Sequence, residues 1–300
     1  MGNLEHPLFD TRDIKWVFLD LDNTLWDFDA NAKEALKELY ERHQLHLHCD
    51  WHVDAFINLY QDVNAAYWKR YEKGEVDKET LRTARFYDTF NEMGIPAVLQ
   101  PANVWQEYLD ICPVMTILMP GAMDALKKIS KKFKVAILTN GFEKTQQLKL
   151  QSNGLLNMVD LLISSEQLGI AKPNCEFFET ALSMAGVGAN EVIYIGDNWH
   201  TDVIGGVDAG IVTFWYQSNL LEELNALESE VVNQNSITEE NESDIGGNDA
   251  WDDDLIFAAK TGVLMGLVDT ENDMDAVTKL EDFYGGAVGD WSKFSQWLCD

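Results

Sequence analysis

The sequence predicts an α/β protein in which a Rossmann-like parallel sheet core carries an inserted helical cap domain. Two observations support this fold class. Short apolar runs alternate with helix-like segments, and one long helical stretch separates the first run from the second. Alternating strands and helices are typical of a parallel sheet with helices on both faces. Such a doubly covered sheet is built from nearly continuous apolar strands, as these runs are.

Five short apolar runs are the expected strands. They lie at residues 16–19, 135–138, 161–163, 192–195 and 211–215. Each of the last four runs follows a helix-like segment, and these segments are residues 121–131, 143–153, 174–185 and 199–208. Pro173 is expected to begin the third of these helices, because proline is favoured in the first helical turn.

The stretch between the first and second runs has a helical pattern throughout. The expected helices are residues 31–43, 51–72 and 78–93, with Asp50 and Asp77 as N-caps of the last two and Gly74 and Gly94 beyond their ends. This stretch is much longer than a crossover connection requires. The sequence therefore predicts a cap domain at residues 26–114, inserted into a core formed by residues 1–25, 115–217 and 286–300.

The net charge is strongly negative, because 51 Asp and Glu residues against 22 Lys and Arg residues give a formal charge of −29. Nucleic-acid backbones and anionic membrane surfaces attract basic proteins, so neither is an expected partner. The acidic side chains are concentrated toward the carboxyl terminus, where residues 233–254 contain no basic side chain. We expect residues 218–285 to be an acidic, partly flexible insertion.

No apolar run approaches the ~18 residues of a membrane-spanning helix. The first residues lack the basic and apolar regions of a secretory signal. The four cysteines are scattered, without a Cys-x-x-Cys pair, which is typical of free thiols in a reducing compartment. We therefore expect a cytoplasmic protein.

Two carboxylates, Asp20 and Asp22, follow the first apolar run with one residue between them. Like charges this close at the end of a buried strand raise a pKa or require a cation. Mg²⁺ would meet that requirement, because it prefers oxygen ligands. A helix N-cap beside a solvated acid is the alternative interpretation of this pair.

Three more polar groups follow later strands. Thr139, Asn140 and Gly141 come after the second, Lys172 after the third, and Asp197 and Asp202 after the fourth. Each group separately also fits an ordinary strand–turn–helix junction or a solvated side chain. Ligands of open α/β sheets bind outside the carboxyl ends of the strands, where all four groups are expected to meet. Together they indicate a site that holds a dianionic phosphate against Mg²⁺.

The same residues resemble the four motifs of the haloacid dehalogenase-like phosphohydrolases with a cap between motifs one and two. The matching motifs are Asp20-x-Asp22-x-Thr24, Thr139, Lys172-Pro173 and Gly196-Asp197-x4-Asp202, within about residues 10–217. More closely, the chain is similar to bacterial pyrimidine 5′-nucleotidases of this superfamily. The similar segments are residues 71–74, 85–86, 120–122, 137–142 and 169–174.

The resemblance implies a two-step hydrolysis of a phosphate ester. Asp20 would be the nucleophile and would form an aspartyl phosphate. Asp22 would protonate the leaving alkoxide and then deprotonate the water that hydrolyses the intermediate. Thr139 and the backbone amides of Asn140 and Gly141 would hold the phosphoryl oxygens.

The resemblance also implies how the charges at the site would be balanced. Lys172 would neutralise charge on Asp20 and on the phosphate. Mg²⁺ would be bound by Asp20, by the carbonyl of Asp22 and by Asp197, with Asp202 in the outer shell. The ion and the lysine would together stabilise the charge of the transferring phosphoryl group.

The expected function is therefore Mg²⁺-dependent hydrolysis of a small phosphorylated metabolite, with a pyrimidine nucleoside 5′-monophosphate as the expected substrate. Phosphoglycolate or a sugar phosphate is an alternative substrate class. A non-catalytic phosphate-binding protein would be expected to lack Asp20 or Asp22, and a dehalogenase lacks the acid at position 22. In the cap, Arg85 is a candidate contact for polar groups of the substrate; its alternative is a solvated helix residue.

Overall fold

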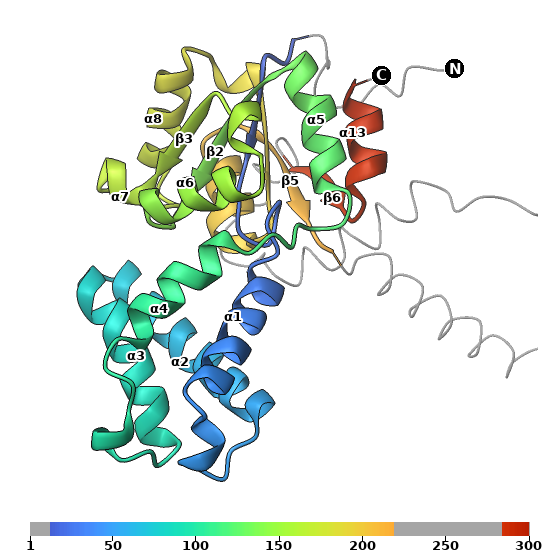
Figure 1. Cartoon of the computed structure of the whole chain (residues 1–300). Coiled ribbons are helices and arrows are strands. Elements are labelled where there is room, and N and C mark those ends of the chain that lie inside the picture. Colours follow the sequence, from blue (N-terminus) through green and yellow to red (C-terminus); the bar gives the residue numbers. More distant parts are fainter. Residues whose placement is uncertain (1–12, 219–283, 300) are drawn as a thin grey trace, which may run out of the picture. The chain divides into compact units, whose positions relative to one another are not determined.

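The computed structural model describes residues 13–218 and 284–299 of the chain (Figure 1). Contacts between Cα atoms divide the chain into two compact units. Within the described residues, unit 1 comprises residues 13–25, 118–140, 158–218 and 284–299, and unit 2 comprises residues 26–117 and 141–157. Among the described residues, no helix is both long and apolar enough to cross a membrane.

Unit 1 contains a parallel sheet whose six described strands follow the order β3-β2-β1-β4-β5-β6. The strands are β1 (Trp16–Leu19), β2 (Lys134–Thr139), β3 (Leu161–Ser164), β4 (Val192–Gly196), β5 (Val212–Tyr216) and β6 (Tyr284–Val288). The five predicted strands are confirmed, each to within one residue at either end. The sixth was not predicted, because the two glycines in β6 interrupt any apolar run.

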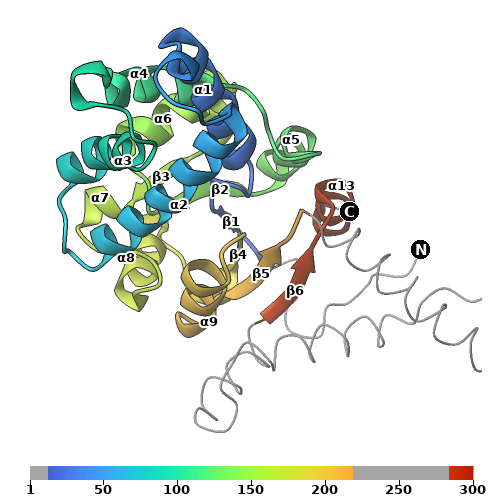
Figure 2. The ribbon, with the colours of Figure 1, turned by 90° about the horizontal axis from the view of Figure 1, so that it is seen from below.

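Helices cover both faces of this sheet, as the apolar strands predict. In unit 1 the described α-helices are α5 (Ala122–Lys132), α7 (Ser165–Leu168), α8 (Cys175–Ala185), α9 (Gly205–Asp208) and α13 (Trp291–Cys299). A π-helix (Trp199–Ile204) precedes α9. Figure 2 shows α5 and α13 on one face of the sheet and α8 and α9 on the other.

Pro173 does not begin α8, which corrects the prediction made for this residue. The N-cap of α8 is Asn174, whose side chain accepts a hydrogen bond from the backbone N–H of Glu176. The side chain of an N-cap asparagine accepts a hydrogen bond from a free N–H group of the first helical turn, and proline has no side-chain acceptor for this purpose. The helix therefore begins after the asparagine, at Cys175.

Unit 2 is helical. Its described α-helices are α1 (Phe28–Arg42), α2 (Val53–Glu72), α3 (Lys78–Glu92), α4 (Val104–Ile111) and α6 (Glu143–Ser152). Asp77 is the N-cap of α3, as predicted, and accepts from Thr80 N. Asp50 is not the N-cap of α2, which was a wrong prediction: His52 holds that position, and α2 starts two residues later than expected.

The predicted core range 115–217 includes α6, yet α6 belongs to unit 2. Phe142, immediately before α6, explains this grouping. Its ring centroid lies 5.6 Å from the rings of Trp68 and Tyr71, and Lys78 Nζ lies 4.3 Å from it. This aromatic contact anchors residues 141–157 to α2 and α3. The division into a core and a cap domain remains a prediction.

Candidate active site

The register of the sheet brings the predicted residues of unit 1 together. In the central strand β1, Leu19 lies opposite Ile137 of β2 and Ile195 of β4. The residues that follow each strand therefore start from the same edge. Asp20 continues this alignment, since its backbone N–H donates to the carbonyl of Ile195 at 2.9 Å.

Lys172 is the centre of the site. Its ammonium donates to Asp20 Oδ1 and to Asp202 Oδ1, both at 2.6 Å. It also contacts the carbonyl of Leu138 and the hydroxyl of Tyr194, both at 3.0 Å. The side chain is 2% exposed, so these ion pairs are shielded from water.

Asp202 is held on both of its carboxylate oxygens. Oδ1 accepts from Lys172 and from the Tyr194 hydroxyl, the latter at 2.7 Å, and Oδ2 accepts from the backbone N–H of Asn198 at 3.0 Å. A Cβ at Gly196 would lie 2.4 Å from Asp202 Oδ2. Glycine at position 196 is therefore needed for this carboxylate to approach the strand end.

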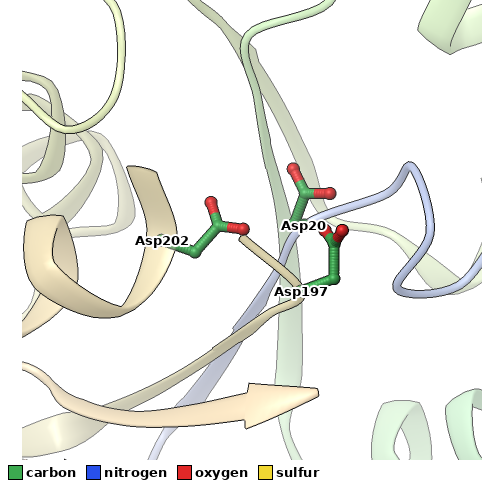
Figure 3. A group of neighbouring side chains, drawn as sticks. All are labelled: Asp20, Asp197 and Asp202. Carbon is green, nitrogen blue, oxygen red and sulfur yellow. The ribbon is translucent and has the colours of Figure 1, made fainter. Parts of the chain in front are cut away.

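Asp197 follows β4 directly. Its Oδ1 accepts from the Thr24 hydroxyl at 3.3 Å, and its backbone carbonyl accepts from Trp215 Nε1 at 2.8 Å. Figure 3 shows Asp197 beside Asp20, with the Asp202 carboxylate pointing toward them from the helical turn. One oxygen from each of these three carboxylates lies within 4.8 Å of the other two.

Asn140 joins the loop after β2 to the loop that carries Lys172. Its Nδ2 donates to the Lys172 carbonyl at 3.0 Å, and its Oδ1 accepts from the Lys172 backbone N–H at 2.9 Å. This two-way pair fixes the backbone from which the lysine side chain extends. Thr139, at the end of β2, is buried beside this junction.

Burial and charge repulsion set the electrostatics of the site. Burial, reinforced by the charges of Asp202, Asp197 and Asp22, raises the pKa of Asp20 well above its ordinary value, although Lys172 opposes the shift. Burial, and then the Asp202 charge, raises the pKa of Asp197 to about 7. Burial lowers the pKa of Lys172, but the two carboxylates that it contacts outweigh that effect and raise it, so the lysine is charged.

The donor set fits a divalent cation. Asp20, Asp197 and Asp202 carry three negative charges when ionised, and Lys172 supplies one positive charge, which leaves an excess of two. Within the described residues, Asp20 Oδ2 accepts no hydrogen bond. Mg²⁺ prefers carboxylate oxygens and would balance this excess. Asp202 is the least available ligand, because both of its oxygens are already held.

For Asp22 and Gly141, two other predicted site residues, the structure gives burial, charge effects and close approaches. Asp22 is half-buried, and its charge acts on both Asp20 and Asp197. A Cβ at Gly141 would lie 2.3 Å from Gln146 Nε2, so a larger residue here would require the Gln146 side chain to shift.

Arg85 is not a solvated helix residue, so that alternative was wrong. It lies in unit 2 and is 5% exposed. Its Nη1 donates to Asn64 Oδ1 at 2.5 Å. The guanidinium is surrounded by three aromatic rings, with centroid distances of 5.4–5.7 Å to Tyr60, Phe86 and Tyr108. A substrate contact by Arg85 remains a prediction.

Sequence reasoning missed the Tyr194 hydroxyl and the Asn140 side chain. Tyr194 lies within the apolar run of β4 and looked like a core residue. Its position two residues before the Gly196-Asp197 motif was an available clue, because alternate strand residues face the same side. Asn140 was expected to act only through its backbone amide.

Comparisons with known proteins identify relatives of the chain. A family model described as haloacid dehalogenase-like hydrolase matches residues 14–210. The pyrimidine 5′-nucleotidase YjjG of Escherichia coli (strain K12) is 30% identical over 205 residues, which cover 68% of this chain and 86% of the relative. The pyrimidine 5′-nucleotidase PynA of Streptococcus pneumoniae is 31% identical over 210 residues, which cover 69% and 86%.

Solved structures show the same fold. The crystal structure of the HAD-hydrolase YfnB from Bacillus subtilis, bound to magnesium, matches with a TM-score of 0.62 and 26% identity. The match covers 71% of this chain and 98% of YfnB.

Proposed function

Because this chain belongs to the haloacid dehalogenase-like hydrolase family, we propose that it is a Mg²⁺-dependent phosphatase that forms an aspartyl phosphate. We further propose a pyrimidine nucleoside 5′-monophosphate as its substrate. The observation that carries the proposal is the buried Asp20 carboxylate, held at 2.6 Å by Lys172 beside Asp197 and Asp202. A carboxylate fixed in this way is suited to attack phosphorus.

In the first step, an oxygen of Asp20 forms a bond to phosphorus as the bond to the ester oxygen breaks. Asp22 gives its proton to the departing alkoxide, which leaves as a neutral alcohol. The half-buried position of Asp22, with its charge felt at Asp20, supports this role. A positioned acid of this kind contributes about 10²–10⁴-fold in rate.

In the second step, water attacks the phosphorus of the aspartyl phosphate, and the bond between Asp20 and phosphorus breaks. Asp22, now a carboxylate, takes the proton of that water. Free phosphate leaves, and both acids return to their starting protonation states. The same pair of carboxylates therefore serves both steps.

The phosphoryl oxygens are proposed to bind Thr139 and the backbone N–H groups of Asn140 and Gly141. Lys172 keeps its charge beside Asp20 and offsets the charge of the phosphoryl group during transfer. The side chain of Asn140 supports this arrangement, because it fixes the backbone of Lys172.

Asp20, the Asp22 carbonyl and Asp197 are the residues proposed to hold Mg²⁺, with Asp202 outside its ligand shell. When bound, the ion would neutralise charge on the phosphoryl oxygens and orient the phosphate for in-line attack. The excess of two negative charges at the site supports a divalent ion.

The substrate proposal rests on the relatives YjjG and PynA, which are named as pyrimidine 5′-nucleotidases. The test is a panel of phosphate esters, assayed for release of inorganic phosphate with and without Mg²⁺. The panel should contain pyrimidine and purine nucleoside 5′-monophosphates, phosphoglycolate and sugar phosphates. We expect Mg²⁺-dependent release with the highest kcat/KM for pyrimidine nucleotides. A preference for phosphoglycolate or a sugar phosphate would overturn the substrate assignment, but the proposed phosphatase activity would stand.

Mg²⁺ affinity is expected to depend on pH through Asp197. A proton and the cation compete for this carboxylate, whose pKa is about 7 without metal. Lowering the pH from 8 to 6 protonates Asp197, so the apparent Kd for Mg²⁺ should rise about tenfold. Calorimetric titration at the two pH values measures the change. Equal affinity at both would contradict the role of Asp197. An Asp197→Asn variant should bind Mg²⁺ more weakly and show a smaller pH dependence than the wild type, because Asp20 still titrates at the site.

A further inference from the structure

Tyr194 is a buried residue of β4 whose hydroxyl lies inside the charge cluster. The hydroxyl donates to Asp202 Oδ1 at 2.7 Å and accepts from Lys172 Nζ at 3.0 Å. The phenol ring packs edge-on against Phe178, with the ring centroids 5.5 Å apart. Burial, followed by the charge of Asp202, raises the pKa of Tyr194 well above its ordinary value, so the hydroxyl keeps its proton.

The number of hydrogen-bond donors and acceptors around Lys172 indicates what the Tyr194 hydroxyl does. The Lys172 ammonium has three N–H donors, and four acceptors lie within 3.0 Å of Nζ. Without the Tyr194 hydroxyl, the Lys172 ammonium at 2.6 Å and the more distant Thr201 hydroxyl at 3.4 Å would be the donors to Asp202 Oδ1, and this oxygen would draw the ammonium toward itself. The Tyr194 proton offsets part of the Asp202 charge, and Nζ lies at 2.6 Å from both Asp20 and Asp202.

We propose that Tyr194 is a positioning residue for phosphoryl transfer, which acts through Asp202 to keep the Lys172 ammonium centred on the nucleophile Asp20. This inference rests on the proposed function. During transfer, Asp20 loses its negative charge as it becomes an acyl phosphate. The Lys172 ammonium must then stay close to the phosphoryl group to offset its charge. Tyr194 and Asp202 both contact the Lys172 ammonium independently of Asp20.

The test is Tyr194→Phe, which removes the hydroxyl and keeps the ring contact with Phe178. We expect kcat to fall about tenfold while KM and the Mg²⁺ midpoint change by less than about threefold, because the lost contact supports the transition state rather than binding. The matched control is Tyr40→Phe, which also removes a buried, bonded hydroxyl, donated to the Trp51 carbonyl at 2.6 Å in unit 2. The control should show a similar change in Tm and an unchanged kcat.

A double-mutant cycle with Asp202→Asn tests the route of the effect. If Tyr194 acts through Asp202, the double variant should be about as active as Asp202→Asn. Losses that multiply would overturn the inference, as would an unchanged kcat in Tyr194→Phe.

A crystal structure of Tyr194→Phe gives a readout that does not depend on any substrate. We expect Lys172 Nζ to lie closer to Asp202 than to Asp20, in place of the equal distances of the wild type. Equal distances would overturn the inference. A wild-type chain that hydrolyses no phosphate ester would instead refute the proposed function, and the crystal structure would still decide the role of Tyr194.

Discussion

Replacing Asp20 with asparagine is expected to abolish release of inorganic phosphate from every ester in the panel. The amide is nearly isosteric but is not a nucleophile toward phosphorus, so no aspartyl phosphate can form. Removal of a nucleophile typically costs at least about 10⁴-fold in kcat. The measurement is phosphate release under saturating Mg²⁺ and substrate.

The Asp20→Asn variant should remain folded, which makes the loss interpretable. Asp20 is one of three clustered carboxylates, and its pKa is raised because the charged form is disfavoured there. An uncharged amide removes repulsion, while Lys172 keeps its ion pair with Asp202. The Tm of the metal-free variant at pH 8 should therefore equal or exceed that of the wild type. Mg²⁺-dependent hydrolysis at the wild-type rate would show that another group is the nucleophile.

Replacing Lys172 with methionine is expected to impair both activity and stability. The change leaves Asp20 and Asp202 buried without their counter-charge, and breaking a buried ion pair typically costs about 3–5 kcal/mol of unfolding free energy. The loss of positive charge beside the phosphoryl group should lower kcat at least about 100-fold. Denaturant unfolding and phosphate release measure the two effects separately.

The stability loss in Lys172→Met should depend on pH in a defined direction. Without the lysine, its charge no longer opposes the effect of burial on Asp20, so the pKa of this carboxyl in the folded state rises further above its value in the unfolded chain. The folded state then binds more protons than the unfolded state, so the variant should gain stability relative to wild type as the pH falls. The control is Lys15→Met, which removes an ion pair with Glu191 from a lysine whose side chain is 63% exposed. This surface change should alter stability by about 1 kcal/mol or less, and an equal loss in both variants would contradict the buried role of Lys172.

The central sheet and the identity of the clustered residues could be predicted because they depend on local patterns. Apolar runs define β1 to β5, and the polar residues that follow them must converge where parallel strands end. The resemblance to the haloacid dehalogenase-like family is confirmed by the family model and by the relatives. Lys172, Asp20 and Asp202 are in hydrogen-bond contact, as a shared site requires.

The remaining features depend on contacts between distant residues. β6 is held by pairing with β5, and its own sequence is rich in glycine. Helix α2 begins two residues later than predicted, because His52 has the geometry of an N-cap and the stronger capping residue Asp50 does not hold that position. The alternation of strand residues could have indicated which face Tyr194 occupies, but its partner is a lysine 22 positions away in the chain, which no local pattern identifies.

Unit 2 is formed by two chain segments, and this has a consequence for protein engineering and for the way this family can diversify. The unit is assembled from two separate pieces of chain, residues 26–117 and 141–157. Phe142 lies next to Gly141 of the proposed phosphate loop and is packed among Trp68, Tyr71 and Lys78. A chimera that imports only the longer piece from a relative would surround this phenylalanine with foreign neighbours. Chimeras that exchange unit 2 should therefore fold more often when both pieces come from the same relative.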